Sequence, residues 1–582
     1  MQQKYNRIKV ATMKTLIDTV SQKFKKRIAL STFEDELSEI SYSKLIFYVK
    51  SIAIALQEKG MKKGDKAVIL GESSQNWALA YFAITYFGGI AVSILPNFSK
   101  EEVDKIVEHS QATFVFADSA NIYKIQDQPI VKIRLDDLHF LPEANFADLK
   151  SKLTKKEALN LPGLDSSRTK LTNKQLKMVD EAQVDEQDLA SIIYTSGTTG
   201  TPKGVMLTHK NIIWNADICS VEFLKIKKGW KFLSILPLSH VYEFTLGLIL
   251  PLLCGCQVVY LGRPATPSVL IPAFKKVRPQ FLLTVPILIE KTYRRAVLPE
   301  IEKSPRIQRL LKNPLTKNFV YHSIGRMIKQ KYGGKVEFFG IGGSALDKEV
   351  EKFLFQTTFP YAIGYGLTET SPMVAGCGPQ SKNHKLGCIG KIVPTIQIKF
   401  SEENEILIKG DGVMKGYYRN EELTKEVFTE DGFFKSGDLG YLNKHNLLVI
   451  NGRSKAMILG SNGENIFPEQ IEGIINNQKF VQESLVIPEN GGLLALIKID
   501  LEAYAQNFKL NINDARTDAD KYVKKLRENI NLQLNPSLRI NQTELQDEPF
   551  ERTPTMKIKR YLHIDQRKKG NKENKDIKDK TE

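Results

Sequence analysis

The stretch YTSGTTGTPKGVMLTH, residues 194–209, decides the fold that we expect for this chain. An apolar run over 189–193 precedes it and a helical pattern over 211–219 follows it, so the sequence predicts a strand, a loop and a helix. Glycines let a backbone approach an anion closely, hydroxyl groups donate hydrogen bonds, and Lys203 adds a positive charge. A strand–loop–helix unit of this composition is typical of phosphate binding.

This loop differs from a Walker A motif, because Pro202 stands where that motif needs its second glycine. A flexible surface loop is the alternative, but such a loop does not require so many hydroxyl groups and glycines. The residues that favour phosphate binding are Ser196, Gly197, Thr198, Thr199, Gly200, Thr201, Lys203 and Gly204.

The length and charge of the chain limit its organisation and its partners. At 582 residues it exceeds a single hydrophobic core, which stops growing at about 250–300 residues, so we expect at least two domains. Apolar residues make up 42% and charged residues 26%, which excludes a wholly disordered chain. The net charge is +17, and residues 566–582, with seven basic and four acidic residues, contribute only +3 of it. The +14 that remains suits a nucleotide, a cofactor phosphate, lipid head groups or nucleic acid.

Cysteine usage and the N-terminus indicate the compartment. The five cysteines form neither a disulfide framework nor a CxxC pair, which favours a reducing compartment. The first residues, MQQKYNRIKVATMK, lack the apolar core of a secretory signal. We therefore expect a cytoplasmic protein, with contact at the inner face of a membrane left open.

One uncharged apolar run, FTLGLILPLLCGCQVVYL at 244–261, is long enough to be considered as a membrane span. Proline, glycine and glutamine interrupt it, and VVYL is typical of a strand. We expect a buried helix, a turn and a strand rather than a span.

Helical and strand patterns alternate along most of the chain, which predicts parallel sheets covered by helices. Ser99 and Glu102 form a capping box at the start of one such helix. Residues 118–188 and the basic stretch 291–332 are expected to be surface excursions. A second, α+β pattern begins after Gly452, so we expect a large domain over 1–452, a small domain over 453–565 and a disordered charged tail over 566–582.

Six further motifs follow the Gly/Thr loop: PLSHVYE at 237–243, GIGGSAL at 340–346, YGLTET at 365–370, SGDLG at 436–440, GRSKAMI at 452–458 and PTMKIKR at 554–560. In this order they resemble the adenylate-forming (AMP-binding) superfamily, which includes acyl-CoA synthetases, luciferases of the firefly type and the adenylation domains of peptide synthetases. The form TPTMKIKR resembles the long-chain fatty acyl-CoA synthetase branch. The resemblance implies an α/β fold, with a large N-terminal domain of helix-covered, mostly parallel sheets and a small, mobile α+β C-terminal domain.

The resemblance also implies a nucleotide site for ATP. Glu369 would hold Mg²⁺, for which an oxygen ligand is suitable, and Thr368 would donate a hydrogen bond to phosphate. Tyr365 would stack on adenine, although ordinary core packing is the alternative for this ring. Lys203 and Thr195 would assist catalysis from the Gly/Thr loop. The remaining residues expected to contact the nucleotide here are Gly342, Gly343, Ser344 and Gly366.

The C-terminal motifs are expected to complete this site. Asp438 resembles the aspartate that accepts hydrogen bonds from both ribose hydroxyls, and Arg453 would contact ribose or phosphate nearby. Lys557 would join the carboxylate and the α-phosphate during adenylation. The chain departs from the commoner pattern because Met556 stands where a glycine is usual, which leaves Lys559 as a rival.

Two further roles follow from the resemblance. Lys455 stands at the hinge position between the domains. At such a hinge, a few residues absorb a rotation of the small domain, which would bring the glycine loop 460–463 into the site. Many relatives carry aspartate at or just after this position, whereas this chain has Lys455-Ala456. His240 would lie beside the acyl carboxylate as a gate or an orienting donor, with a buried core histidine as the alternative.

Together these features predict an ATP- and Mg²⁺-dependent ligase that activates a carboxylic acid as an acyl-adenylate and transfers it to CoA. The acid is expected to be a medium- or long-chain fatty acid, on the basis of the PTMKIKR variant, the length and the basic stretch 291–332. That stretch and the apolar run at 244–261 could also contact an anionic bilayer.

Several alternatives remain open at this point. The ligase could activate a different acid or load a carrier-protein thiol, or the chain could bind an acyl-adenylate or a fatty acid without catalysis. Nucleic-acid binding is not expected, because the charge is dispersed and no basic–aromatic motif is present. The oligomeric state is left open between monomer and homodimer.

Overall fold

The computed structural model describes residues 10–33, 37–125, 130–141, 171–195, 202–223, 226–459, 465–489, 491–553 and 558–567. The chain divides into two compact units. The first unit comprises Met1–Lys399, Leu407–Ser436 and Leu442–Val449, and the second comprises Phe400–Ile406, Gly437–Tyr441 and Ile450–Glu582. The predicted domains, with their boundary after residue 452, stay a prediction.

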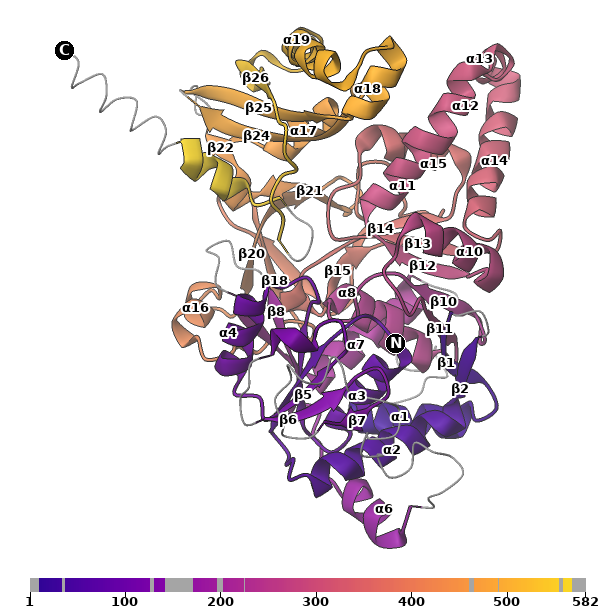
Figure 1. The fold of residues 1–582 in the computed structure, drawn as a ribbon, viewed down its shortest axis with the longest axis vertical. Helices are drawn as coiled ribbons and strands as arrows, with labels where there is room; N and C mark the ends of the chain where they lie inside the picture. The colour runs from indigo at the N-terminus through magenta and orange to yellow at the C-terminus, as the bar shows by residue number, and fades with distance from the viewer. Residues whose placement is uncertain are drawn as a thin grey trace, which may run out of the picture. The chain divides into compact units, whose positions relative to one another are not determined.

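The first unit contains an eight-stranded sheet in the order β19-β9-β8-β4-β3-β5-β6-β7 (Figure 1). Its central strands, from β8 through β6, run parallel, as the alternation of helices and strands predicts. Antiparallel strands flank them at both edges. The strands are β3 (Lys66–Leu70), β4 (Ile90–Ile94), β5 (Phe114–Ala117), β6 (Val131–Arg134), β7 (His139–Phe140), β8 (Leu189–Thr195), β9 (Lys203–Thr208) and β19 (Gly416–Tyr417).

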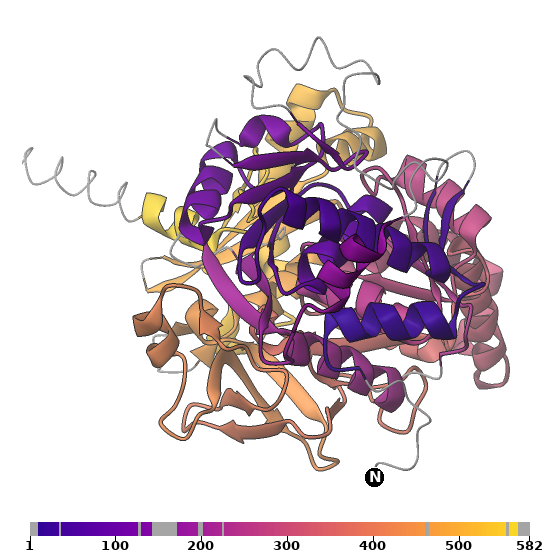
Figure 2. The same cartoon turned by 90° about the horizontal axis from the view of Figure 1, so that it is seen from below.

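Helices connect these strands and cover the sheet. The predicted capping box is present at the start of α4, where the Ser99 hydroxyl accepts from the Glu102 backbone N–H and the Glu102 carboxylate accepts from the Ser99 backbone N–H. The indigo helices near the N-terminus lie together in Figure 2. The helices of this part are α1 (Met13–Lys23), α2 (Tyr42–Glu58), α3 (Gln75–Tyr86), α4 (Lys100–Ser110) and α7 (His209–Glu222).

A nine-stranded sheet in the order β16-β15-β14-β13-β12-β10-β11-β1-β2 forms the other half of the first unit. The six strands from β14 to β1 run parallel, and both edges are antiparallel. Stacked phenylalanines line one face, with the rings of Phe281 and Phe338 4.7 Å apart. The strands are β1 (Ile28–Thr32), β2 (Ser38–Ser41), β10 (Lys231–Ser234), β11 (Gln257–Tyr260), β12 (Phe281–Thr284), β13 (Phe338–Ile341), β14 (Tyr361–Gly366), β15 (Met373–Gly376) and β16 (Lys391–Ile392).

The apolar run at 244–261 is buried, as the sequence predicts. It forms the π-helical turn η3 (Phe244–Ile249), the short helix α9 (Leu250–Leu253), a turn and strand β11. Most of its side chains are fully enclosed, so this run is not available for the bilayer contact that the sequence suggested. Within the described residues, no helix has the length and apolarity required to cross a membrane.

The two stretches expected to be surface excursions contain regular structure. Residues 291–332 form consecutive helices whose inner faces join the main hydrophobic core, because Val320, Ile324 and Ile328 recur at helical spacing. Residues 118–188 contribute β6, β7 and helix α6 (Asn173–Asp180). The helices of the later part are α10 (Pro267–Val277), α11 (Pro286–Thr292), η4 (Tyr293–Val297), α12 (Leu298–Lys303), α13 (Pro305–Lys312), α14 (Pro314–Lys331), α15 (Lys348–Thr357) and α16 (Glu421–Glu426).

The second unit has its own hydrophobic core around a three-stranded sheet in the order β24-β25-β26. Its helices and strands form the α+β pattern that the sequence predicts after Gly452. Residues 566 and 567, expected to begin the disordered tail, end a helix over 560–567 instead, and the rest of that tail lies outside the described residues. The elements are α17 (Pro468–Asn476), β24 (Val481–Glu489), β25 (Gly492–Ile499), α18 (Leu501–Phe508), α19 (Ile512–Asn531) and β26 (Gln542–Leu545).

The remaining strands form a four-stranded sheet in the order β17-β18-β20-β21 and the pair β22-β23. These strands carry the SGDLG and GRSKAMI motifs. Their bounds are β17 (Gln397–Phe400), β18 (Glu405–Lys409), β20 (Phe434–Leu442), β21 (Leu448–Arg453), β22 (Ile458–Leu459) and β23 (Asn465–Ile466).

Candidate active site

The Gly/Thr loop joins two strands of a hairpin. Strand β8 ends at Thr195 and pairs with β9, which begins at Lys203, so these two residues face each other at the open end. Helix α7 begins only at His209 and is capped by Thr208. The helix predicted over 211–219 lies within α7, but the strand before it was missed, because Lys203–Thr208 forms β9 between β8 and β19.

Most of the predicted phosphate contacts belong to the loop between the two strands of the hairpin. Ser196, Gly197, Thr198, Thr199 and Gly200 lie outside the described residues. The structure describes the two ends of the loop, Thr195 and Lys203, both half-buried.

Strand β19 connects the hairpin with Glu369. It pairs with the outer edge of β9, where the Tyr418 backbone N–H donates to the Gly204 carbonyl at 2.8 Å. This pairing places the buried Tyr417 so that its hydroxyl donates to Glu369 Oε1 at 2.9 Å. Lys203 Nζ lies 5.6 Å from the centre of the Tyr417 ring. Two predicted residues from distant motifs, Lys203 and Glu369, therefore contact the same tyrosine.

Burial and the neighbouring carboxylate fix the protonation of Tyr417. Both effects disfavour a second negative charge and raise the pKa of Tyr417 well above its usual range. The hydroxyl therefore remains a donor, and the Glu369 carboxylate keeps an acceptor role. The Met414 backbone N–H also donates to the Glu369 carbonyl at 2.8 Å, so one segment holds both the main chain and the side chain of Glu369.

The YGLTET motif follows the carboxyl end of β14, where ligands bind in sheets of this kind. Gly366 is required there, because a Cβ on it would lie 1.7 Å from the Pro372 carbonyl oxygen. Thr368 and Glu369 follow in the 3-10 turn η5 (Thr368–Thr370) and are half-buried. Tyr365 is largely buried within β14, as the core-packing alternative expects, and its stacking on adenine stays a prediction.

Gly342, Gly343 and Ser344 form the turn that leaves the neighbouring strand β13. Gly343 has a φ of 86°, a conformation that glycine adopts without strain. Gly343 and Ser344 are exposed, whereas Gly342 is buried beneath the Tyr242 ring. The structure therefore brings the GIGGSAL and YGLTET motifs to the ends of adjacent parallel strands.

His240 lies in the turn before the short helix α8 (Val241–Glu243) and is half-buried. The Tyr242 backbone N–H donates to His240 Nδ1 at 3.3 Å, so the imidazole caps the helix. A neutral ring with Nδ1 as acceptor carries its proton on Nε2. The role of gate or orienting donor stays a prediction.

In the second unit, Asp438 and Arg453 are brought together. Asp438 is buried and forms an ion pair with Arg453, with 3.0 Å between Oδ1 and Nε. The Ser454 hydroxyl donates to the Gly437 carbonyl, and the Gly437 N–H donates to Glu405 Oε1. Lys455 is exposed in the turn η6 (Ser454–Ala456) that follows. Lys557 and the glycine loop 460–463 lie outside the described residues.

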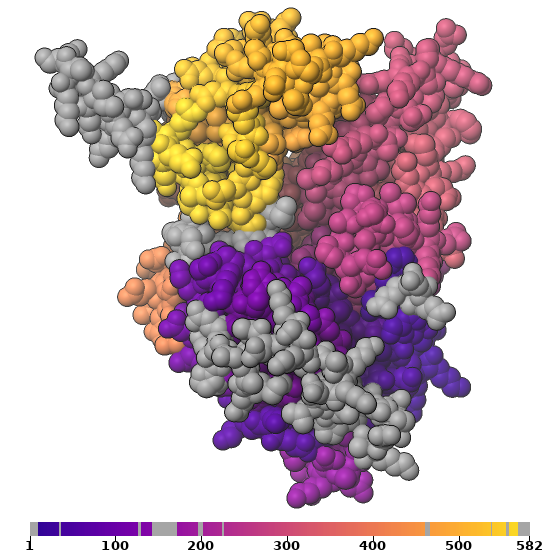
Figure 3. Space-filling view, viewed as in Figure 1, coloured from indigo at the N-terminus to yellow at the C-terminus, as the bar shows by residue number. Residues whose placement is uncertain are grey.

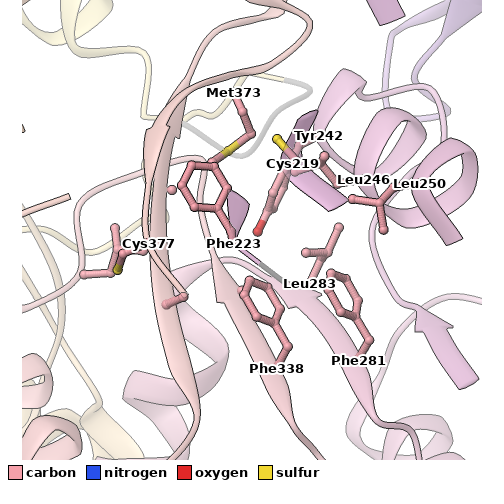
Figure 4. Close-up of a pocket in the computed structure, with 14 residues that line it drawn as sticks. Cys219, Phe223, Tyr242, Leu246, Leu250, Phe281, Leu283, Phe338, Met373 and Cys377 are labelled. Carbon is pink, nitrogen blue, oxygen red and sulfur yellow. The ribbon is translucent and has the colours of Figure 1, made fainter. Parts of the chain in front are cut away.

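An apolar cavity lies in the first unit between the nine-stranded sheet and helices α7, α8 and α9 (Figure 4). Figure 4 shows Phe281 and Phe338 side by side beneath Leu283, with Phe223 and Tyr242 among the side chains above them. No charged side chain lines the cavity among the described residues. The lining residues are Cys219, Phe223, Tyr242, Leu246, Leu250, Phe281, Leu283, Phe338, Gly340, Ala362, Ile363, Gly364, Met373 and Cys377.

A buried carboxyl group lies next to this cavity. Glu243 immediately precedes η3, and its Oε2 has no hydrogen-bond partner among the described residues. Burial raises the pKa of Glu243 to about 8, so the group is mostly protonated at neutral pH. Gly247 leaves room for it, because a Cβ there would lie 2.6 Å from Glu243 Oε1.

The sequence analysis missed Tyr417 and Glu243 as candidate functional residues. The signal for Tyr417 was the short run Gly416-Tyr417-Tyr418, in which a glycine precedes two tyrosines. The signal for Glu243 was a single carboxylate at the border of an uncharged apolar run. The burial of such a residue depends on segments that are distant in the sequence, so only the structure shows its environment.

The comparisons with known proteins agree with this geometry. The family described as AMP-binding enzyme matches residues 17–418. The Long-chain-fatty-acid--CoA ligase FadD15 of Mycobacterium bovis is 27% identical over 560 residues, covering 88% of this chain and 88% of its own length. The Long-chain-fatty-acid--[acyl-carrier-protein] ligase AEE15, chloroplastic, of Arabidopsis thaliana is 26% identical and covers 94% of this chain and 84% of its own length.

Among solved structures, the O-succinylbenzoate coenzyme A synthetase (MenE) of Bacillus subtilis, in complex with ATP and magnesium ion, has a TM-score of 0.69. It is 22% identical and covers 94% of this chain and 98% of its own, and this likeness confirms the predicted α/β fold. The predicted resemblance to adenylate-forming enzymes is also confirmed by the match over 17–418, and this chain belongs to the AMP-binding enzyme family.

Proposed function

We propose that this chain is an ATP-dependent ligase that activates a medium- or long-chain fatty acid and transfers it to CoA. In the first step a carboxylate oxygen attacks the α-phosphorus of ATP, and pyrophosphate leaves with the electrons of the broken P–O bond. In the second step the CoA sulfur attacks the acyl carbon, the thiol proton is released, and AMP leaves. The products are acyl-CoA, AMP and pyrophosphate.

The apolar cavity is the observation that carries the fatty-acid assignment. Its walls include Gly340 in β13 and Gly364 in β14, the two strands that lead to the predicted nucleotide contacts. The open volume of this cavity is about 30 Å³, too small for an alkyl chain as it stands, so the lining side chains would move apart to admit one. The chain would then lie against the base of these strands, with its carboxylate toward their carboxyl ends. Fourteen lining residues without a charge suit a hydrocarbon and offer no partner to a charged side chain of an amino acid.

The phosphates of ATP are proposed to lie between the hairpin and Glu369. Lys203 offers a positive charge and the Gly/Thr loop offers hydroxyl and backbone donors, which position anions that would otherwise repel. No group of three or more metal-ligating side chains occurs in the described part of the chain. Glu369, the proposed ligand of Mg²⁺, suits this ion, because Mg²⁺ in such sites is held by one or two carboxylates, phosphates and water. When bound, the ion would neutralise phosphate charge.

The second unit is proposed to supply the remaining contacts. Asp438 would accept hydrogen bonds from the ribose hydroxyls, with Arg453 beside it and paired to it. Lys557 would stabilise charge during adenylation. Lys455 would lie at the hinge about which the small domain rotates from the adenylating arrangement to the one that forms the thioester. All five cysteines are free thiols, which suits the reducing cytoplasm.

Release of pyrophosphate, measured across fatty, aryl and amino acids with and without CoA, tests this proposal. We expect release with saturated fatty acids and acyl-CoA formation when CoA is added. In the variant Lys557→Ala, pyrophosphate release should be lost while thioester formation from supplied acyl-adenylate survives. The matched variant Lys559→Ala should keep both reactions. Failure to exchange labelled pyrophosphate into ATP with every acid would contradict the proposal.

A carrier-protein thiol is the second candidate acceptor, favoured by the similarity to the acyl-carrier-protein ligase of Arabidopsis thaliana. Adenylation is the same in both cases, so only the second half-reaction separates them. Acyl transfer should be measured with equal concentrations of CoA and of phosphopantetheinylated carrier protein. A preference for the carrier of about tenfold or more in kcat/KM would favour this second function.

A further inference from the structure

A strongly basic segment lies at the end of the helical region between α12 and β13. Residues 303–336 contain nine lysines and arginines and no aspartate or glutamate. The chain folds this segment into α13 and α14, with a single residue, Asn313, between them. In Figure 1, α13 lies at the upper end of this helical region, and α14 runs from it back toward the nine-stranded sheet. We call residues 303–326 the basic hairpin.

The outer face of α14 carries large apolar side chains that face solvent. Leu315 is 91% exposed, more than any other large apolar side chain in the described part of the chain, and Phe319 is 74% exposed. In the space-filling view of Figure 3, the atoms of this region reach the edge of the molecule. The outer stripe follows helical spacing and consists of Leu315, Phe319, His322 and Arg326.

Helix α13 adds a basic face to this apolar one. Ile307, Leu310 and Leu311 pack against the core, and the opposite side of the helix presents Arg306, Arg309 and Lys312 to solvent. None of these three basic side chains forms an ion pair with any described residue. Their charges are therefore available to an external anionic surface.

The basic hairpin packs tightly against the rest of the first unit. Val320, Ile324 and Ile328 bury the inner face of α14 in the main core. Gly325 lets α14 approach α15 closely, since a Cβ there would lie 2.2 Å from the Thr357 carbonyl oxygen. Leu315 and Phe319 are thus held outward by a packed helix and have no room to turn into the core.

We infer that the basic hairpin docks this protein on an anionic lipid surface. Unpaired cations attract acidic head groups, and each contributes about tenfold or less in affinity near such a surface. Leu315 and Phe319 would insert between acyl chains, a contact that a nucleic acid or a small anion does not offer. The benefit of docking rests on the proposed function, because fatty acids partition into bilayers and the docked protein would meet its substrate there.

Vesicle co-sedimentation of the full chain tests this inference without ATP, CoA or acid, so its failure is distinguishable from failure of the proposed function. The probes are vesicles of phosphatidylcholine with phosphatidylglycerol and vesicles of phosphatidylcholine alone. We expect binding to the anionic vesicles that falls as salt rises. The double variant Leu315→Asp, Phe319→Asp should lower the partition coefficient about tenfold or more.

A matched control separates docking from a change in net charge. The double variant Ile512→Asp, Leu532→Asp adds the same two charges at the two ends of α19, the first residue and the C-cap, where these side chains are 51% and 83% exposed. It should bind anionic vesicles nearly as well as the unchanged protein. Equal loss in both double variants would show a general charge effect and overturn the inference.

Charge removal provides a second, independent test. The triple variant Arg306→Gln, Arg309→Gln, Lys312→Gln should lose about 100-fold in partitioning. The control Lys509→Gln, Lys521→Gln, Lys525→Gln removes three exposed charges elsewhere and should lose much less. Absence of vesicle binding by the unchanged protein would overturn the inference. So would a dimer, seen by sedimentation velocity, that the Leu315 and Phe319 substitutions abolish.

Discussion

Two regions of the first unit that contain large apolar side chains, 244–261 and the basic hairpin, place these side chains in opposite environments. The first is uncharged and contains a run long enough to suggest a membrane span, yet its side chains are buried. The second is interrupted by arginine and lysine every few residues, yet it exposes Leu315 and Phe319. An uncharged run must be enclosed on all sides, whereas a run with regular charges can keep one helical face in water. Exposure therefore follows the spacing of charges more closely than the total apolar content.

The largest expected effect concerns Glu243, the one carboxyl group at the border of the buried region. Its pKa is about 8 in the folded chain and would be near 4.5 in the unfolded chain. The folded state therefore holds a proton that the unfolded state loses, and stability should fall as pH rises from about 5 to 8 and then level off. The fall should reach roughly 4 kcal/mol.

Urea denaturation at pH 5 and pH 9 measures this change. In Glu243→Gln, which has no titration, the difference between the two pH values should shrink by most of that amount. An equal pH dependence in this variant would show that other groups cause it. The variant Glu302→Gln, at an exposed position near the basic hairpin, should leave the pH dependence unchanged.

Truncation of one leucine in each region should sharpen the contrast. Leu248 in η3 is fully buried, so Leu248→Ala should lower the free energy of unfolding by about 3 kcal/mol through lost contacts and a cavity. Leu315→Ala should change it by less than about 0.5 kcal/mol. Urea unfolding at one pH measures both. Similar losses would contradict the environments described for the two segments.

A polar contact within the candidate site and a polar contact beside the basic hairpin should also differ in their effect on activity. Tyr417→Phe removes the donor to Glu369 Oε1, a hydrogen bond to a charged group worth about 2 kcal/mol. We expect the Mg²⁺ concentration for half-maximal pyrophosphate release to change about tenfold. Lys329→Ala breaks an exposed ion pair with Glu337 beside the basic hairpin and should leave this concentration unchanged. A shift in stability alone would assign Tyr417 a purely structural role.

The smallest expected effect is on acid preference. Cys219 lines the cavity from α7, so Cys219→Phe should narrow it and favour shorter fatty acids by about tenfold in kcat/KM ratios. Ser220→Phe places the same ring on the neighbouring position, which does not line the cavity, and should keep the original preference. Identical preferences in all three proteins would remove the cavity from the acid site.

Local patterns predicted much of the fold from the sequence. The capping box at Ser99 and the α+β pattern after Gly452 depend on neighbouring residues, and they occur where expected. The strand over 203–208 was missed, because Gly204 and Thr208 weaken its alternation and the loop before it suggested a helix. The burial of one face of 291–332 was missed because its basic residues suggested a surface stretch, although Val320, Ile324 and Ile328 recur at helical spacing.

The candidate site was predictable only where a motif carries its own chemistry. Lys203, Glu369 and Asp438 were predicted from their motifs, but no local pattern indicates that Tyr417 links two of them. That link depends on β19 pairing with β9 across about two hundred residues, as the Tyr417–Val205 pair shows. Pairing at such separation is set by the whole sheet and cannot be derived from a local pattern.

The bridging strand β19 has a mechanical consequence. Its backbone is hydrogen bonded to β9, which starts at Lys203, and its tyrosine is hydrogen bonded to Glu369. If a bound anion displaces the hairpin, β19 and the Tyr417 hydroxyl should move with it. If a bound cation displaces the Glu369 carboxylate, the same connection should displace the hairpin. Linkage between two such positions is reciprocal, so an anion bound at the hairpin and a cation bound at Glu369 should change each other's affinity by the same factor.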